Sequence, residues 1–200
     1  MEPFTPIEAT AVPIAQSNVD TDQILPARFL HKLRRHGFGQ YLFHDLRFAA
    51  DGSENAGFVL NHPRYREARI LVAAQNFGCG SSRENAVWAL CDYGFRVVIA
   101  PGFGDIFHSN CLKNGLLPVV LPPDVVAGLL QSLAAIPGSS VHVDLALQTV
   151  TASDGARHTF DVDPFARHCL LNGVDELDYT LSRMDEIIAF ERANLGSEST

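Results

Sequence analysis

The middle of the chain alternates between short apolar runs and amphipathic runs, and this alternation constrains the possible folds most strongly. The expected order is strand 69–74, helix 83–93, strand 95–100, helix 105–113 and strand 116–121. Each strand is joined to the next through a helix, which favours parallel strands in one sheet that helices cover. The sequence therefore predicts an α/β fold with a mixed, mostly parallel sheet flanked by helices.

The flanking segments extend this pattern. We expect a strand over 8–14 and a helix that opens at Pro122 and runs to about Ala135. Further along, Asp154-Gly155 separates two alternating runs, 148–152 and 157–162, which is typical of a β-hairpin. The sheet is therefore expected to gain an antiparallel β-hairpin after its parallel part.

The length of 200 residues and the hydrophobic fraction of 46% suit one well-buried domain. We expect a single domain over 1–194, with an irregular connection over 31–63 where glycines interrupt the pattern, and a flexible tail over 195–200. The last helices are expected over 164–171 and 184–192.

Charge and hydropathy exclude two classes of partner. The net charge is -8 and the chain has only 15 Lys and Arg residues, which disfavours nucleic acid because binding to phosphates needs clustered cations. The first ten residues lack a signal pattern, and no apolar run approaches membrane-spanning length. A cytoplasmic protein with no nucleic-acid or membrane partner is expected.

The cysteines do not form a metal-binding pattern. Cys79, Cys91, Cys111 and Cys169 are far apart and include no C-x-x-C pair, so no zinc or iron–sulfur site is expected from this chain alone. We expect reduced thiols. Cys79 lies in a glycine-rich turn, but no neighbouring His offers a base that would favour a nucleophilic role.

That turn, Asn76 to Glu84, reads N-F-G-C-G-S-S-R-E and lies where a strand crosses to a helix. Ser81 and Glu84 have the spacing of a capping box, which predicts that Ser81, Ser82 and Arg83 lie at the helix N-terminus. The free N–H groups and the helix dipole there attract carboxylate or phosphate. A nearby arginine can add a bidentate hydrogen-bonded contact. The segment is a candidate anion site.

Other interpretations of this turn are less well supported. A dinucleotide motif would need glycine where the chain has Arg83, a P-loop would need a Gly-Lys-Ser/Thr ending, and a serine hydrolase would need G-x-S-x-G. A purely structural interpretation, in which the serines cap a helix and Arg83 forms a surface salt bridge, remains open on local grounds.

Over about Phe4 to Arg192 the chain resembles the small subunit of 3-isopropylmalate dehydratase, in the aconitase superfamily. The resemblance is strongest where a T-D-x-I segment precedes G-S-S-R-E. It is carried by residues 18–26 (N-V-D-T-D-Q-I-L-P), 76–84, 88–90 (W-A-L), 92–95 (D-Y-G-F), 97–101 (V-V-I-A-P), 167–169 (R-H-C) and 172–173 (N-G). From the acceptor-rich residues at 18–22 we expect a turn that leads into a short buried strand.

The resemblance implies an aconitase-like swivelling β/β/α domain and half of an enzyme. In the family a separate large subunit carries a [4Fe–4S] cluster, and the small subunit closes over it. The reaction implied is a hydro-lyase isomerisation of 2-isopropylmalate to 3-isopropylmalate by dehydration and rehydration, in leucine biosynthesis. This chain itself would bind no cofactor.

The resemblance also implies roles for individual residues. Ser81 would be the general base, and Ser82 and Arg83 would hold a substrate carboxylate. Asp22 would orient groups of the site by hydrogen bonding, and Asp20 is expected to have a structural role in its turn. Two further residues, Arg35 and Arg34, would face the second carboxylate of a dicarboxylic hydroxy-acid or the partner of their loop.

Two departures leave the substrate open. Family members commonly read S-S-R-E-H-A-P, whereas this chain has Asn85 and Val87. Asn85 can form hydrogen bonds but cannot titrate near neutral pH as His can. One alternative is a related hydro-lyase for another methyl- or dimethyl-malate, and a second is a stand-alone anion-binding module.

Overall fold

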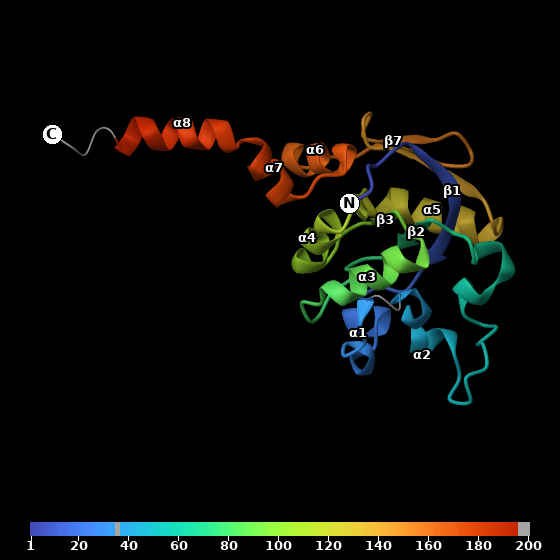
Figure 1. Ribbon diagram of the computed structural model, residues 1–200. Helices are drawn as coiled ribbons and strands as arrows, with labels where there is room; N and C mark the ends of the chain where they lie inside the picture. The colour runs from blue at the N-terminus through green and yellow to red at the C-terminus, as the bar shows by residue number, and fades with distance from the viewer. Residues whose placement is uncertain (35–36, 196–200) are drawn as a thin grey trace.

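The computed structural model describes residues 1–34 and 37–195, and the strands in these residues form one seven-stranded sheet in the order β4-β3-β2-β1-β5-β6-β7. The strands are β1 (Ile7–Ile14), β2 (Ile70–Ala73), β3 (Val97–Ala100), β4 (Leu117–Val120), β5 (Ser140–Asp144), β6 (Thr149–Thr151) and β7 (Arg157–Thr159). The helices are α1 (Thr21–Ile24), α2 (His44–Arg47), α3 (Glu84–Tyr93), α4 (Asp105–Lys113), α5 (Pro123–Ala135), α6 (Pro164–Asn172), α7 (Glu176–Ser182) and α8 (Met184–Leu195). Figure 1 shows the helices around the sheet.

Strands β1 to β4 form the parallel half of the sheet. Strands β2 and β3 are buried along their whole length, as expected of parallel strands that are covered on both faces. Alternate residues enter two separate cores: Leu71 and Val98 pack with α3 and α4, whereas Ile70 and Val97 pack with α5. The β-α-β-α-β order predicted for the middle of the chain is confirmed.

Strands β5, β6 and β7 form the antiparallel half, which joins the parallel half through β1. The predicted hairpin is confirmed: β6 pairs with β7 around a turn in which Gly155 has a φ of 87°. The first strand therefore connects both halves, and the mixed α/β fold expected from the sequence is present.

The segment after β1 differs from the prediction. We expected a short buried strand, but the chain forms helix α1, with Asp20 as its N-cap. The Asp20 carboxylate accepts from Gln23 N at 2.7 Å, and Gln23 Oε1 accepts from Asp20 N at 3.0 Å. This capping box starts a helix. The acceptor-rich residues at 18–22 alone indicate only a turn. The structural role predicted for Asp20 is confirmed.

The described residues of the connection over 31–63 are mostly irregular. Besides α2, its described residues form short 3-10 turns, η3 (Gly39–Tyr41) and η4 (Val59–Asn61), between η1 (Ala27–Phe29) and η5 (Pro63–Tyr65). Buried side chains such as Phe38, Leu42, Phe43 and Leu60 join it to the core that contains α3. The connection is thus packed against the same helix that follows the glycine-rich turn.

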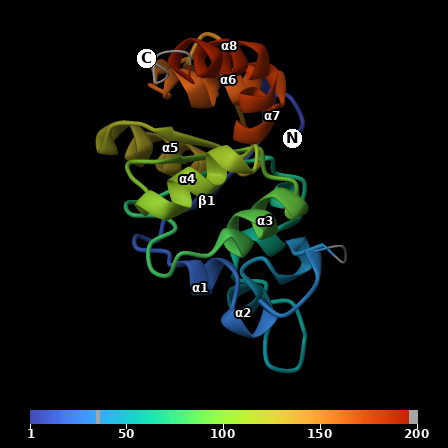
Figure 2. The ribbon, with the colours of Figure 1, turned by 60° about the vertical axis from the view of Figure 1, so that its left-hand side comes forward.

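The described part of the chain ends in three helices rather than the predicted two. Helix α7 was not predicted, although its N-cap Asp175 forms a capping box with Asp178. Helix α8 projects away from the body in Figure 1 and groups with α6 and α7 in Figure 2. The predicted tail over 195–200 falls outside the described residues except for Leu195, which ends α8. No helix in the described parts of the chain is long and apolar enough to span a membrane.

Candidate active site

Loops that follow three adjacent parallel strands meet at one edge of the sheet, the edge where α/β folds commonly bind ligands. The loop after β2 lies between the other two. Gly78 N donates to Val19 O at 2.8 Å in the loop after β1, and Gly104 N, in the loop after β3, donates to Phe77 O at 3.0 Å. The glycine-rich turn is therefore fixed on both sides by backbone hydrogen bonds.

The two sequence motifs are joined directly. Thr21 N donates to Cys79 O at 2.9 Å, and the Thr21 hydroxyl donates to Ser81 O, also at 2.9 Å. Thr21 is buried, so this contact is shielded from water. Sequence reasoning assigned no role to Thr21 because no local signal shows that a residue 60 positions away lies beside Ser81.

Arg83 and Asp22 form an ion pair across 61 positions of sequence. The Arg83 side chain is 19% exposed and that of Asp22 is 50% exposed. The structure therefore brings together two of the residues predicted for the site. A guanidinium has five N–H donors, so Arg83 can contact Asp22 and a carboxylate ligand at the same time.

The predicted capping box at Ser81 and Glu84 is wrong. Arg83 is the N-cap of α3, with extended backbone at φ −136° and ψ 105° and no side-chain cap hydrogen bond. The helix thus begins later than a Ser81 cap requires, and the Glu84 carboxylate instead accepts from Asn114 Nδ2 at 2.8 Å. Ser81 and Ser82 are exposed. They precede a helix start that has no side-chain cap, which leaves its positive end accessible to an anion.

A hollow of about 190 Å³ opens beside Ser81. It is lined by Gly78, Gly80, Ser81, Gly104, Asp105, Ile106 and Phe107. Gly78 has a φ of 72°, and a Cβ there would overlap the Phe107 ring. A Cβ on Gly104 would lie 2.6 Å from Gly78 O. Glycine is thus needed at both positions. The acidic Asp105 was missed, because only the fold places the start of α4 beside the turn.

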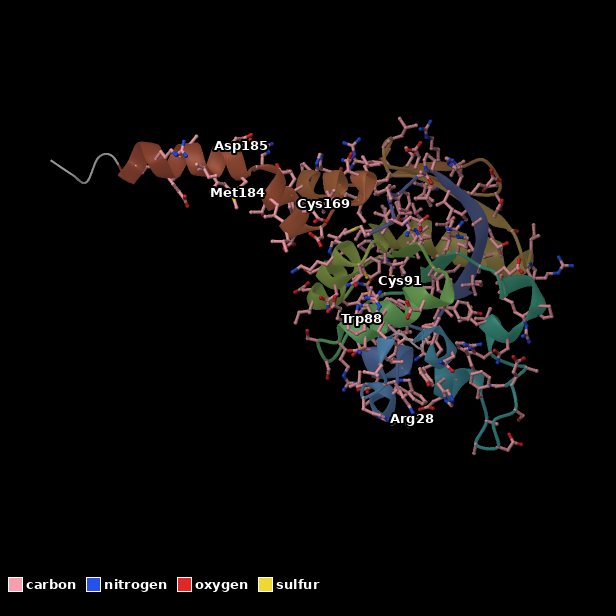
Figure 3. All side chains as sticks on the ribbon, viewed as in Figure 1. Arg28, Trp88, Cys91, Cys169, Met184 and Asp185 are labelled. Atoms are coloured by element: carbon pink, nitrogen blue, oxygen red, sulfur yellow. The ribbon has the colours of Figure 1, made fainter. Side chains whose placement is uncertain are left out.

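Of the two arginines predicted for the site, the structure describes only Arg34. The Arg34 guanidinium stacks on Trp88 of α3, with its carbon 4.7 Å from the ring centroid. Trp88, labelled in Figure 3, is further fixed by its indole N–H, which donates to Asn114 Oδ1 at 2.9 Å. Arg34 therefore lies beside the helix that follows the motif, but it stacks on the body of α3 rather than on its first residues. Arg35 lies outside the described residues.

The two departures from the family motif occupy different environments. Val87 is fully buried in the core, so its side chain does not reach the site. Asn85 is half-buried on the first turn of α3. Only Asn85 is therefore placed to influence a bound ligand.

The cysteines are free thiols, and burial raises the pKa of Cys91 to about 11 and that of Cys111 well above its ordinary value. Across residues 1–34 and 37–195, no group of three or more His, Cys, Asp or Glu side chains is arranged to hold a metal ion. The side chains of this site therefore do not fit an iron–sulfur cluster.

Comparison with known proteins identifies the family. The family model described as the aconitase C-terminal domain matches residues 1–124, and a second, LeuD_N, matches 127–164. The 3-isopropylmalate dehydratase small subunit of Paramagnetospirillum magneticum is 52% identical over 96% of both chains, and that of Cereibacter sphaeroides is 50% identical over 96% of both. The chain belongs to the 3-isopropylmalate dehydratase small-subunit family. 

A solved structure agrees with this assignment. The crystal structure of a 3-isopropylmalate dehydratase from Methanocaldococcus jannaschii has a TM-score of 0.66 and 25% identity, and the match covers 94% of this chain and 99% of that one. Membership of the small-subunit family, expected from the T-D-x-I and G-S-S-R-E motifs, is thus confirmed. The fold class is confirmed by the same neighbour.

Proposed function

We propose that this chain is the small subunit of a two-subunit 3-isopropylmalate dehydratase, a hydro-lyase, and that its Ser81 turn forms half of the active site. The observation that carries the proposal is the joining of two family motifs. Thr21 and Asp22 from one motif contact Ser81 and Arg83 from the other at the N-terminus of α3. In a chain half identical to named small subunits, this joining supports assigning the activity to the Ser81 turn.

Ser81 acts as the general base in this proposal. As an alkoxide, Ser81 takes the carbon-bound proton during dehydration. The electron pair of that C–H bond forms the new double bond, and the hydroxyl on the adjacent carbon leaves with its bonding pair, for which the large subunit's cluster would supply a Lewis acid. During rehydration the Ser81 hydroxyl returns its proton to carbon as the hydroxyl is added back. A serine oxygen needs stabilisation of its negative charge to do this, and the positive end of α3 together with Arg83 is placed to supply it. Closure of the site against water would strengthen both interactions.

Arg83 and Ser82 hold a substrate carboxylate, and Asp22 positions the Arg83 guanidinium. The ion pair restricts a long side chain before the substrate arrives, which reduces the entropy lost on binding. Arg34 and Arg35 are proposed to face the second carboxylate or the partner subunit. Stacking on Trp88 would hold Arg34 in place for that purpose.

The partner is a large subunit that covers the exposed Ser81 turn. We place the [4Fe–4S] cluster implied by the family on that subunit, because the described side chains of this chain do not form a ligand set. We also propose that residues 1–194 move as one swivelling domain and that the enzyme is cytoplasmic, where the four thiols would remain reduced.

The substrate follows from the names of the relatives, and Asn85 is the residue that bears on it. Val87 is buried in the core and does not discriminate between substrates. Comparing kcat/KM for 2-isopropylmalate with that for citramalate and dimethylmalate tests the assignment. A preference for a shorter acid would assign the chain to a related hydro-lyase.

The central experiment reconstitutes the enzyme from this chain and a cognate, cluster-loaded large subunit. We expect isopropylmalate conversion by the complex and none by this chain alone. Ser81→Ala should lower kcat by at least about 10³-fold, because no other group takes over proton transfer at that atom. Ser17→Ala, at an exposed serine in the loop after β1, is the matched control and should leave kcat unchanged.

Binding of the Ser81→Ala variant to the large subunit should equal that of the wild type. Full activity in this variant would remove Ser81 from the role of base. Tight binding of a dicarboxylate to the isolated chain, measured by calorimetry, would instead support a stand-alone anion-binding module.

A further inference from the structure

A continuous hollowed surface follows α4 from the Ser81 turn to the C-terminal helices. The hollow beside Ser81 shares Asp105 with a second hollow of about 390 Å³. The second shares His108 and Ser109 with a third, of about 660 Å³, which reaches Phe165 of α6 and Leu177 of α7. We call these three adjoining hollows the α4 trough.

The C-terminal helices extend this surface. Helices α7 and α8, residues 176–195, are called the arm. Leu177 and Leu181 lie four residues apart on α7, and Met184 and Ile188 lie four residues apart on α8, so the members of each pair share one face of their helix. Their exposed fractions are 65%, 53%, 45% and 38%. Exposed apolar side chains gathered on two successive helices are typical of an interaction surface.

The arm and the trough lie on the same side of the molecule. Figure 2 shows α4 and α3 on the near side, with α6, α7 and α8 above them. In Figure 1 the arm extends past the end of α4, and Figure 3 shows Met184 and Asp185 leaving the arm on different sides. A partner seated on the trough would therefore meet the arm.

We propose that the α4 trough and the arm together form the docking surface for the large subunit, an inference that rests on the proposed function. The partner must cover Ser81 to exclude water from the site, and the hollow beside Ser81 continues into the trough. A second copy of this chain bound there would obstruct the same turn. The large subunit is the occupant that can both cover Ser81 and fill the trough.

The side chains that line the trough indicate what kind of surface the large subunit presents to it. The trough carries the acidic side chains Asp105, Asp163, Asp175 and Glu176, with Lys113 lying 3.8 Å from Glu176. Its lining also includes apolar side chains such as Leu112, Phe165 and Leu177. We therefore expect the matching surface of the large subunit to combine apolar side chains with basic ones.

The test places one positive charge at a time on the arm, where it would be buried against apolar side chains and repelled by a basic partner. Leu181→Lys and Ile188→Lys are compared with Ile136→Lys, a matched change at a 65% exposed position that follows α5. The dissociation constant of the complex with the large subunit is measured by sedimentation and by titration of activity. We expect each arm variant to weaken binding at least about tenfold, with kcat at saturating large subunit unchanged. Ile136→Lys should bind like the wild type.

Binding within twofold of wild type in both arm variants would overturn the inference. So would a wild-type chain that dimerises alone through the arm, if the variants abolish dimers without weakening the complex. A wild-type complex that forms but does not convert isopropylmalate would contradict the proposed function instead, since the sedimentation result is independent of turnover. Unchanged thermal unfolding of each variant shows that its effect is on the interface.

Discussion

At the residue scale, the contact that most shapes the site is the ion pair between Arg83 and Asp22. It brings Asp22 of the T-D-x-I motif into contact with Arg83 of the G-S-S-R-E motif, so the two motifs form one site. The open structural interpretation of Arg83 as a salt-bridge residue is therefore partly right. The pair is compatible with a role in carboxylate binding because the guanidinium retains further donors.

Asp22→Asn tests the positioning role. The amide keeps the size of the side chain but loses its charge, so Arg83 is held less firmly. Since Asp22 is half exposed, we expect a loss of about 1 kcal/mol, or about fivefold in kcat/KM, in the reconstituted enzyme. Glu54→Gln, which removes a comparable ion pair with Arg66, is the control and should have no effect on turnover. Equal effects of the two changes would contradict the assignment.

Cys91 should make the free energy of unfolding depend on pH. Burial raises the pKa of Cys91 to about 11, from 9.0 for an unperturbed thiol. The folded state holds this proton more tightly, so the stabilisation is complete below about pH 9 and is lost as the pH rises to about 11. We expect the difference in unfolding free energy between wild type and Cys91→Ser to shrink over that range, in urea titrations under reducing conditions. A constant difference would show that this thiol does not ionise there.

At the element scale, the turn between β2 and α3 depends on close contact with α4. Gly78→Ala would place a methyl group into the Phe107 ring at a positive φ. Gly155→Ala in the hairpin is the control, because its φ is also positive but no atom lies within 4 Å of the added Cβ. We expect Gly78→Ala to lower the free energy of unfolding by about 2 kcal/mol more than the control does, in urea titrations. Similar values would mean that Phe107 moves aside easily.

At the scale of the whole molecule, the body and the arm should contribute unequally to stability. Ending the chain after Arg183 removes α8, which projects from the body, so the thermal midpoint of the isolated chain should change by less than about 2 °C. Ending it after Asp163 also removes α6, whose Cys169 and Leu170 are buried, and should lower the midpoint clearly. A large fall on removing α8 alone would show that α8 packs on the body.

The sequence by itself determined the alternating strands and helices of the middle of the chain, the hairpin and the family. These features depend on local signals: apolar periodicity, capping residues, and glycines such as Gly94, which ends α3 with a φ of 119°. The same local reasoning failed at Ser81, where the Ser-x-x-Glu spacing predicted a cap. Arg83 has extended backbone instead, and Glu84 is hydrogen-bonded to Asn114, 30 positions away.

Only the tertiary structure decided how the site is assembled. Thr21 meets Ser81, Asp22 meets Arg83, and Asp105 lines the hollow because loops after three parallel strands pack together at one edge of the sheet. Such contacts join residues that are distant in sequence, so no short pattern specifies them. The exposed arm is likewise visible only in three dimensions, because its apolar periodicity would also suit a helix packed on the core.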